Sequence, residues 1–128
     1  MSRFSFMKFL IVDDMEHFRV DLKKILMEEG VKHIYEAING EQAYLKLKKV
    51  GDIDIVLCDI NMPIASGIDF TKTVRSDVAQ SSIPIIIVST ENEKDIIIDA
   101  LAAGATDYII KPYTKDTVLR KIDQIVKS

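Results

Sequence analysis

Hydrophobic residues occur along the chain in five short runs, which predict β-strands at residues 7–12, 33–36, 53–58, 83–88 and 107–110. The first, third and fourth runs are continuously apolar and rich in Ile and Val. This composition is typical of strands that are buried on both faces, because helices cover a parallel sheet from either side.

Between these runs the spacing of apolar residues changes to that of amphipathic helices, predicted at residues 15–29, 39–50, 67–75, 93–103 and 115–126. The first of these helices has apolar residues along one face, namely Phe18, Leu22, Ile25 and Leu26. All of these side chains are expected to face the core.

The fourth predicted helix contains three successive isoleucines at residues 96–98. Successive helical residues are about 100° apart, so the three side chains cannot all face the core. Ile98 is predicted to form a buried stripe with Leu101 and Ala102, which leaves Ile96 or Ile97 near solvent. The exposed residue is either an isolated apolar side chain, as is normal on protein surfaces, or part of a docking surface for a partner.

Strand and helix alternate five times along the chain, which predicts an α/β fold with a five-stranded, doubly wound parallel sheet and five helices. In sheets of this kind, ligands bind outside the carboxyl ends of the strands, where the winding reverses. The residues that follow the apolar runs are therefore the first candidates for a functional site.

Composition adds a few limits to this picture. The length of 128 residues suits a single domain over 1–128. A net charge of −3 without a basic stripe argues against binding to nucleic acid by this domain, and no apolar segment is long enough for a signal or membrane span. The only cysteine, Cys58, excludes an internal disulfide and favours a reducing, cytoplasmic location.

Acidic residues stand at the ends of two predicted strands: Asp13 and Asp14 follow the first run, and Asp59 follows the third. Carboxylates that converge at one place repel one another unless a cation lies among them. Oxygen ligands favour a hard ion, and Mg²⁺ takes one or two carboxylates together with water and phosphate oxygens. Alternatively, Asp13 and Asp14 serve only to cap the following helix.

Two further strand ends add a hydroxyl and an ammonium group. Ser89 and Thr90 follow the fourth run. Lys111 follows the fifth, at the same edge as the acids, and is expected to form an ion pair with Asp59. A carboxylate nucleophile, a divalent ion and a cation for the incoming group are what phosphoryl transfer to an acid requires. Neither glycine-rich nucleotide-binding motif occurs, so the donor is expected to be a phosphoprotein or a small phosphorylated molecule.

These motifs occur in a specific order: Asp-Asp at 13–14, Asp-x-Asn-Met-Pro at 59–63, Gly67, Ser89, and Lys-Pro at 111–112. In this order the chain resembles the receiver domains of two-component response regulators, over essentially its whole length. The resemblance implies a flavodoxin-like fold with strand order 2-1-3-4-5.

The resemblance also implies roles for the acidic residues. Asp59 matches the phosphoacceptor of the family. Asp13 and Asp14 match the acidic pair that holds Mg²⁺, with Asp14 as the expected direct ligand. The metal site is expected to be completed by Asp59 and by the backbone carbonyl of Asn61.

Other matching residues are implied to bind the phosphoryl group or to respond to it. Ser89 and Lys111 are expected to engage the phosphoryl oxygens, and the bond between Lys111 and Pro112 is expected to be cis. Tyr108 matches the aromatic switch residue, although it could simply pack in the core. Ser89 stands where threonine is commoner, and Thr90 where a smaller residue is commoner, so Thr90 is a second switch candidate that is expected to affect dephosphorylation.

The predicted function is therefore that of a phosphoacceptor signalling switch and not of a turnover enzyme. The resemblance implies a sensor histidine kinase or phosphotransfer protein as donor, with a small acyl phosphate as another source, and a downstream target that docks on residues 92–127. The alternatives are a pseudo-receiver that binds partners without phosphorylation, and a receiver fragment of a larger regulator with an output domain. A hydrolase is disfavoured because Asn61, and not an acid, stands two residues after Asp59.

Overall fold

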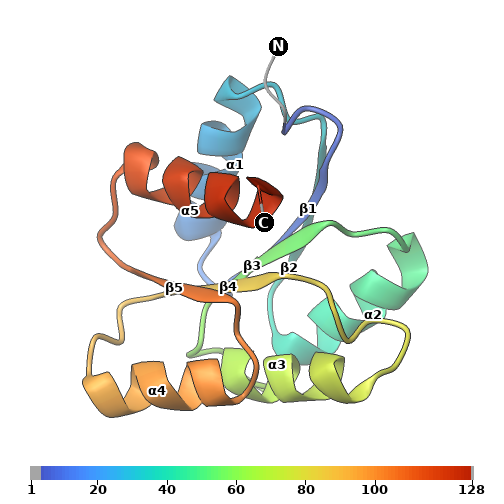
Figure 1. Ribbon diagram of the computed structural model, residues 1–128, viewed down its shortest axis with the longest axis vertical. Helices are drawn as coiled ribbons and strands as arrows, with labels where there is room; N and C mark the ends of the chain where they lie inside the picture. The colour runs from blue at the N-terminus through green and yellow to red at the C-terminus, as the bar shows by residue number, and fades with distance from the viewer. Residues whose placement is uncertain (1–3, 128) are drawn as a thin grey trace.

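A parallel five-stranded sheet runs through the centre of the computed structural model, which describes residues 4–127 (Figure 1). Residues 1–3 and 128 of the predicted domain lie outside the described residues. The strands are β1 (Lys8–Val12), β2 (His33–Ala37), β3 (Ile55–Cys58), β4 (Ile85–Ser89) and β5 (Asp107–Ile110). Their order is β2-β1-β3-β4-β5 and all pairs are parallel, which confirms the predicted fold class.

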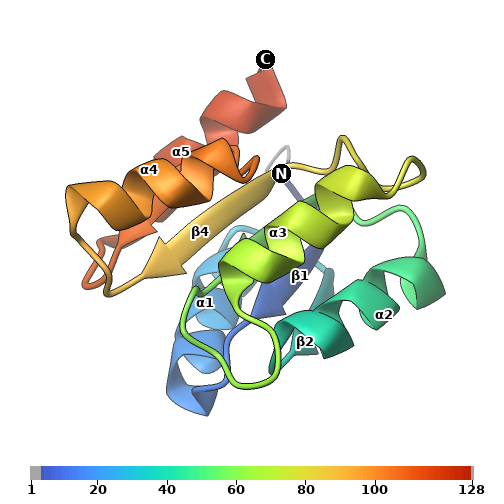
Figure 2. The ribbon, with the colours of Figure 1, turned by 90° about the horizontal axis from the view of Figure 1, so that it is seen from below.

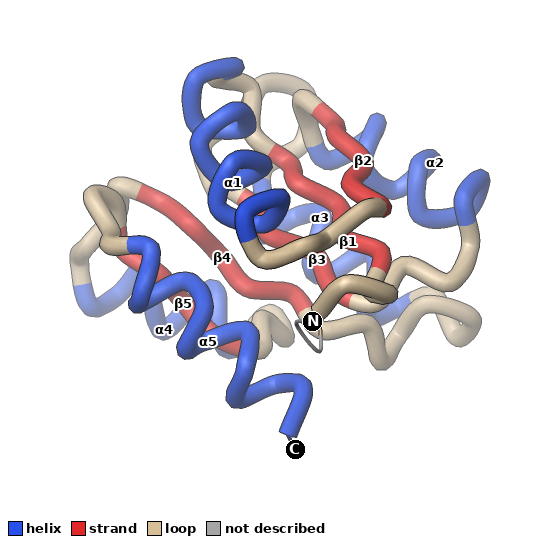
Figure 3. The backbone as a smooth tube through the Cα atoms, turned by 90° about the horizontal axis from the view of Figure 1, so that it is seen from above, coloured by secondary structure: helices blue, strands red, loops and turns tan. Residues whose placement is uncertain are grey.

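Five helices cover the two faces of this sheet, namely α1 (Glu16–Glu28), α2 (Gly40–Val50), α3 (Gly67–Ser76), α4 (Lys94–Ala102) and α5 (Lys115–Lys127). Helices α1 and α5 lie on one face, towards the viewer in Figure 3. Helices α2, α3 and α4 lie on the other face, as Figure 2 shows from the opposite side. Within residues 4–127, none of the helices combines the length and the apolar character needed to cross a membrane.

The hydrophobic core is divided into two clusters because successive side chains of a strand point to opposite faces. On β1, Leu10 and Val12 join the cluster beneath α2, α3 and α4, whereas Phe9 and Ile11 join the cluster beneath α1 and α5. The central strands are buried throughout, as the continuous apolar runs predicted. The sheet is therefore packed on both faces, and the residues that follow its strands lie together at one edge.

The predicted apolar stripe of α4 is wrong. Ile96 and Ile97 pack against the core, whereas Ile98 and Leu101 are 50% and 45% exposed. The helix is oriented by Ala100, which is almost completely buried and whose small side chain lets the helix lie close to the sheet. Residues 96, 97 and 100 share the buried face of the helix. Because α4 has apolar residues on both faces, the spacing of apolar residues did not indicate which face is buried.

The prediction for α1 is correct in part. Leu22, Ile25 and Leu26 are buried, but Phe18 belongs to neither core cluster and is only half-buried. Phe18 lies in the first turn of the helix, beside the carboxyl end of the sheet. Its ring is therefore placed at the candidate site and not in the core.

Candidate functional site

The acidic cluster forms because β1 and β3 are neighbouring strands in register. Val12 pairs with Cys58, so Asp13 and Asp59 follow directly at the same edge, and the Asp59 amide donates to the carbonyl of Val12 at 2.9 Å. Carboxylate oxygens of Asp13, Asp14 and Asp59 lie within 4.8 Å of one another. The structure thus brings together the three acids that the strand ends predicted.

Gly67 is required by the close approach of α3 to the site. A Cβ atom at this position would collide with the backbone oxygen of Asp59. The Gly67 amide also donates to the carbonyl of Ile60 at 2.9 Å, which ties the start of α3 to the residue after Asp59. The glycine therefore allows the loop between β3 and α3 to fold tightly behind the acid.

Lys111, which follows β5, inserts its ammonium group among the acids. Its Nζ lies 2.8 Å from Oδ2 of Asp13 and 3.7 Å from Oδ2 of Asp59, and all three side chains are largely buried. The sequence predicted an ion pair with Asp59, but the shorter contact is with Asp13. Asp13 is oriented by the amide of Met15, which donates to its Oδ1 at 2.9 Å and leaves Oδ2 for the ammonium.

The charge of Asp59 is poorly compensated in this arrangement. Burial raises the pKa of Asp59 above its ordinary value, and the neighbouring charge of Asp13 adds to the increase. The charge of Lys111 and hydrogen bonds from the Ile60 amide and the Ser89 hydroxyl act in the opposite direction without cancelling it. The cluster therefore favours the arrival of further positive charge.

The donor set fits a hard divalent cation. All three groups are carboxylates, and Cys58 is excluded because its side chain lies in the core, where burial raises the pKa of the thiol. Asp14 is exposed, and no donor from residues 4–127 occupies its carboxylate, so it can bind a metal that retains water ligands. The role of the Asn61 carbonyl stays a prediction.

The two hydroxyl candidates after β4 differ in their surroundings. Ser89 is the last residue of the strand, pairs with Ile110 and is fully buried, whereas Thr90 is exposed. The Ser89 Oγ accepts a hydrogen bond from the Glu91 amide at 3.2 Å. Burial beside Asp59 favours Ser89 over Thr90 as the hydroxyl of the site.

Tyr108 is buried, and its hydroxyl donates to the carbonyl of Glu91 at 2.7 Å. The side chain belongs to the core cluster under α4, so it both packs and contacts the loop after β4. The peptide bond between Lys111 and Pro112 is cis, as the resemblance implied. The switch role of Tyr108 stays a prediction.

Two residues near the acids were not singled out as site residues from the sequence. The Oε1 of Glu91 accepts a hydrogen bond from the side-chain Nδ2 of Asn61 at 2.8 Å, so this contact joins the loops after β3 and β4. Phe18 places its ring 3.5 Å from Nζ of Lys111, measured to the ring centroid. Their positions gave the available signal: Glu91 is two residues after Ser89, and Phe18 is four residues after Asp14.

The sequence of this chain matches one family of signalling domains and several of its members. The family model described as the response regulator receiver domain matches residues 9–123. Chemotaxis protein CheY-3 of Vibrio cholerae is 40% identical over 93% of this chain and 91% of its own length. Chemotaxis protein CheY1 of Helicobacter pylori is 38% identical over 94% of this chain and 97% of its own length.

Solved structures of such proteins have the same fold as this chain. A crystal structure of a CheX–CheY–BeF3–Mg2+ complex from Borrelia burgdorferi contains a chain with a TM-score of 0.87 and 30% identity, covering 94% of this chain and 89% of that chain. The chemotaxis protein CheY4 of Vibrio cholerae has a TM-score of 0.84 and 30% identity, covering 92% of this chain and 97% of that chain.

Proposed function

The chain belongs to the family of response regulator receiver domains, which are phosphoacceptor signalling switches, and from this premise we propose that Asp59 accepts the phosphoryl group. The observation that carries the proposal is the convergence of three acids within 4.8 Å, with the ammonium of Lys111 among them. Among these acids, Asp59 combines burial, a raised pKa and a carboxylate oxygen that no short ion pair occupies.

In the proposed reaction, a carboxylate oxygen of Asp59 attacks the phosphorus atom of the donor. A new O–P bond forms, the bond from phosphorus to the donor's nitrogen or oxygen breaks, and the leaving group keeps that electron pair and takes up a proton. The ammonium of Lys111 leaves Asp13 to neutralise a phosphoryl oxygen, and the hydroxyl of Ser89 donates a hydrogen bond to another.

Mg²⁺ is the proposed metal, and Asp13, Asp14, Asp59 and the backbone carbonyl of Asn61 are its proposed protein ligands. When bound, Mg²⁺ would neutralise charge on the carboxylates and the transferring group. Asp14 is the first choice as direct ligand because it is exposed and has no competing partner among residues 4–127.

The proposed signal is a movement of the loop after β4. Phosphorylation adds nearly two negative charges, which draw Ser89 and Lys111 towards Asp59. Tyr108, whose hydroxyl contacts the Glu91 carbonyl of this loop, is then proposed to fill the space that the loop vacates. Thr90, which is exposed beside the site, is proposed to influence access of water and hence dephosphorylation.

The proposed target surface lies within residues 92–127. Exposed apolar side chains occur on both α4 and β5, namely Ile98, Leu101 and Ile110, which are 50%, 45% and 42% exposed. Such residues are suited to contact with a partner protein, and the loop after β4 leads directly into α4. A population shift of this loop would therefore change the affinity of the surface for its target.

The proposed donors are a sensor histidine kinase, a phosphotransfer protein or a small acyl phosphate. The protein is proposed to act on itself, by phosphotransfer and dephosphorylation, and not as a turnover enzyme. We place it in the cytoplasm because its single cysteine is a free, buried thiol, as is common in reducing compartments.

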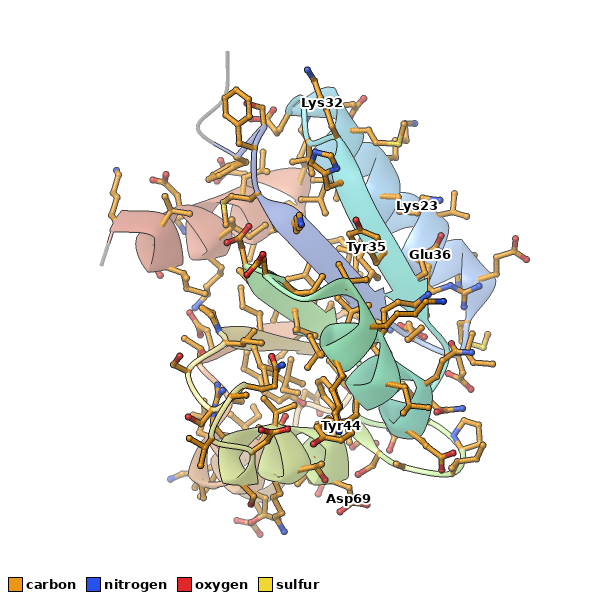
Figure 4. All side chains as sticks on the ribbon, turned by 90° about the vertical axis from the view of Figure 1, so that its right-hand side faces the viewer. Lys23, Lys32, Tyr35, Glu36, Tyr44 and Asp69 are labelled. Carbon is orange, nitrogen blue, oxygen red and sulfur yellow. The ribbon has the colours of Figure 1, made fainter. Side chains whose placement is uncertain are left out.

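The test is labelling with a radioactive acyl phosphate in the presence of Mg²⁺. The wild-type protein is expected to incorporate label, and Asp59→Asn or removal of divalent ions by a chelator is expected to abolish it. Asp69→Asn is the matched control, because Asp69 is an exposed acid in the first turn of α3 outside the cluster (Figure 4). Retained labelling of Asp59→Asn would overturn the assignment, and a wild-type protein without label would support the pseudo-receiver.

A further inference from the structure

The ring of Phe18 lies against the ammonium group of Lys111, with Nζ 3.5 Å from the ring centroid. This distance is well inside the range in which a cation is attracted to the negative face of an aromatic ring. The lysine side chain is only 3% exposed, so water does not screen the attraction effectively. Phe18 is therefore an electrostatic neighbour of Lys111 as well as an apolar one.

Packing in the core does not explain the position of this ring. Phe18 belongs to neither hydrophobic cluster of the described residues, and it is not among the half-buried side chains that pack against them. Apart from Lys111, its described ring partner is the exposed His17, whose ring centroid is 4.2 Å away. A phenylalanine that contributes little to the core points to another role.

The three contacts of the Lys111 ammonium differ in kind. Asp13 at 2.8 Å is a charged partner, Asp59 at 3.7 Å is beyond hydrogen-bond distance, and Phe18 is an uncharged π surface. A carboxylate competes with a phosphoryl oxygen for the ammonium, whereas the ring does not offer a competing anion. The ring can thus hold Nζ in the site both before and after phosphorylation.

We propose that Phe18 is a positioning residue for phosphorylation, which acts through Lys111 by a cation–π contact and keeps the ammonium directed into the acid cluster while it changes partners. This inference rests on the proposed function of Asp59 and Lys111. Without the ring, water would reach the ammonium and the long lysine side chain would occupy other rotamers. Fewer molecules would then have the cation in place when the donor arrives.

The test separates ring electronics from ring shape. Mono-, di- and trifluorinated phenylalanine at position 18 keep the shape of the ring while they progressively remove the negative charge of its face. The rate constant of phosphorylation by a small acyl phosphate is expected to fall stepwise along this series, to about a tenth in the trifluorinated protein. The rate constant of Phe18→Leu is expected to be at least as low. The rate constant of Phe18→Tyr, which keeps the π face, is expected to stay within about twofold of the wild-type value.

The same fluorinated series at Phe9 is the matched control. Phe9 is fully buried in the core at the amino end of β1, away from the acids, so its fluorination is expected to leave the rate unchanged. If the rate were insensitive to fluorination at Phe18 while the wild-type protein was labelled, Phe18 would have only a packing role and the inference would be wrong. If the wild-type protein was not labelled at all, the proposed function would fail instead.

A second readout needs no phosphorylation. In the proton NMR spectrum, the methylene group next to Nζ of Lys111 is expected upfield, because Nζ itself lies over the Phe18 ring, where the ring current shields nearby protons. Phe18→Leu should return this resonance to the ordinary position for lysine. An unshifted resonance in the wild-type protein would show that the contact is not populated in solution and would overturn the inference.

Discussion

Two carboxylates of this protein, Glu36 on β2 and Asp59 after β3, have opposite electrostatic surroundings. Glu36 lies at the edge of the sheet, where Arg19 and Lys23 from α1 each contact one of its oxygens at 3.0 Å. Figure 4 labels Glu36 and Lys23. Partial burial acts to raise the pKa of Glu36, but hydrogen bonds and charges from Lys23 and Arg19 hold it below its ordinary value. Every carboxylate oxygen of Glu36 has its own cation.

Among residues 4–127, the cation beside Asp59 is Lys111, which Asp59 shares with Asp13. Lys111 lies closer to Asp13, and the carboxylates of Asp13 and Asp14 are within 4.8 Å. Burial and the Asp13 charge therefore raise the pKa of Asp59. A carboxylate with its own cations therefore supports the fold, whereas one that shares a cation reduces stability and leaves a place for a metal ion and a phosphoryl group.

Removing the cation that Asp13 and Asp59 share is expected to change the stability more than any other substitution considered for these two carboxylates. Lys111→Met leaves Asp13 and Asp59 buried without a counterion, so it is expected to lower the free energy of unfolding by about 3–5 kcal/mol in urea denaturation without divalent ions. Lys23→Met is the control at the other carboxylate, where the ion pair is partly exposed and a loss below about 1 kcal/mol is expected. Equal losses for the two variants would contradict the comparison.

A smaller effect of opposite sign is expected for Asp59→Asn. The asparagine side chain keeps an oxygen that can accept the hydrogen bond from the backbone N–H of Ile60, but it carries no charge. The free energy of unfolding is therefore expected to rise by about 1 kcal/mol at neutral pH. Because the pKa of Asp59 is higher in the folded state, ionisation costs stability as pH rises from the ordinary value of 3.8 through the folded pKa. The advantage of the variant over the wild type should therefore be absent in acid and grow with pH.

The smallest effect is expected for Glu36→Gln, with the opposite dependence on pH. Glu36 is 35% exposed, so its loss is expected to cost only about 0.5 kcal/mol at neutral pH, and less in about 1 M salt. Because the pKa of Glu36 is lowered by folding, its contribution is present above the ordinary value of 4.5 and is lost as pH falls through the folded pKa. Parallel pH profiles for the variants at Glu36 and Asp59 would show that the two sites do not differ as described.

The sequence alone determined the elements of the fold and the edge at which the site lies. Alternating periodicities are local properties, and a parallel sheet necessarily brings the carboxyl ends of its strands to one edge, so Asp13, Asp59 and Lys111 could be placed together before any coordinates. The predicted ends of the strands agree with the structure to within one or two residues. Strand β4 extends to Ser89 because the backbone of Ser89 pairs with Ile110.

The contacts among these groups follow from how the helices and strands pack. In the structure Lys111 is closer to Asp13 than to Asp59, the Phe18 ring lies against the ammonium and not in the core, and Ala100 is the buried residue of α4. Such choices depend on differences of about an ångström between segments that are far apart along the chain. Periodicity carries no information on such distances, because it records which face of an element is apolar and not which atoms meet across it.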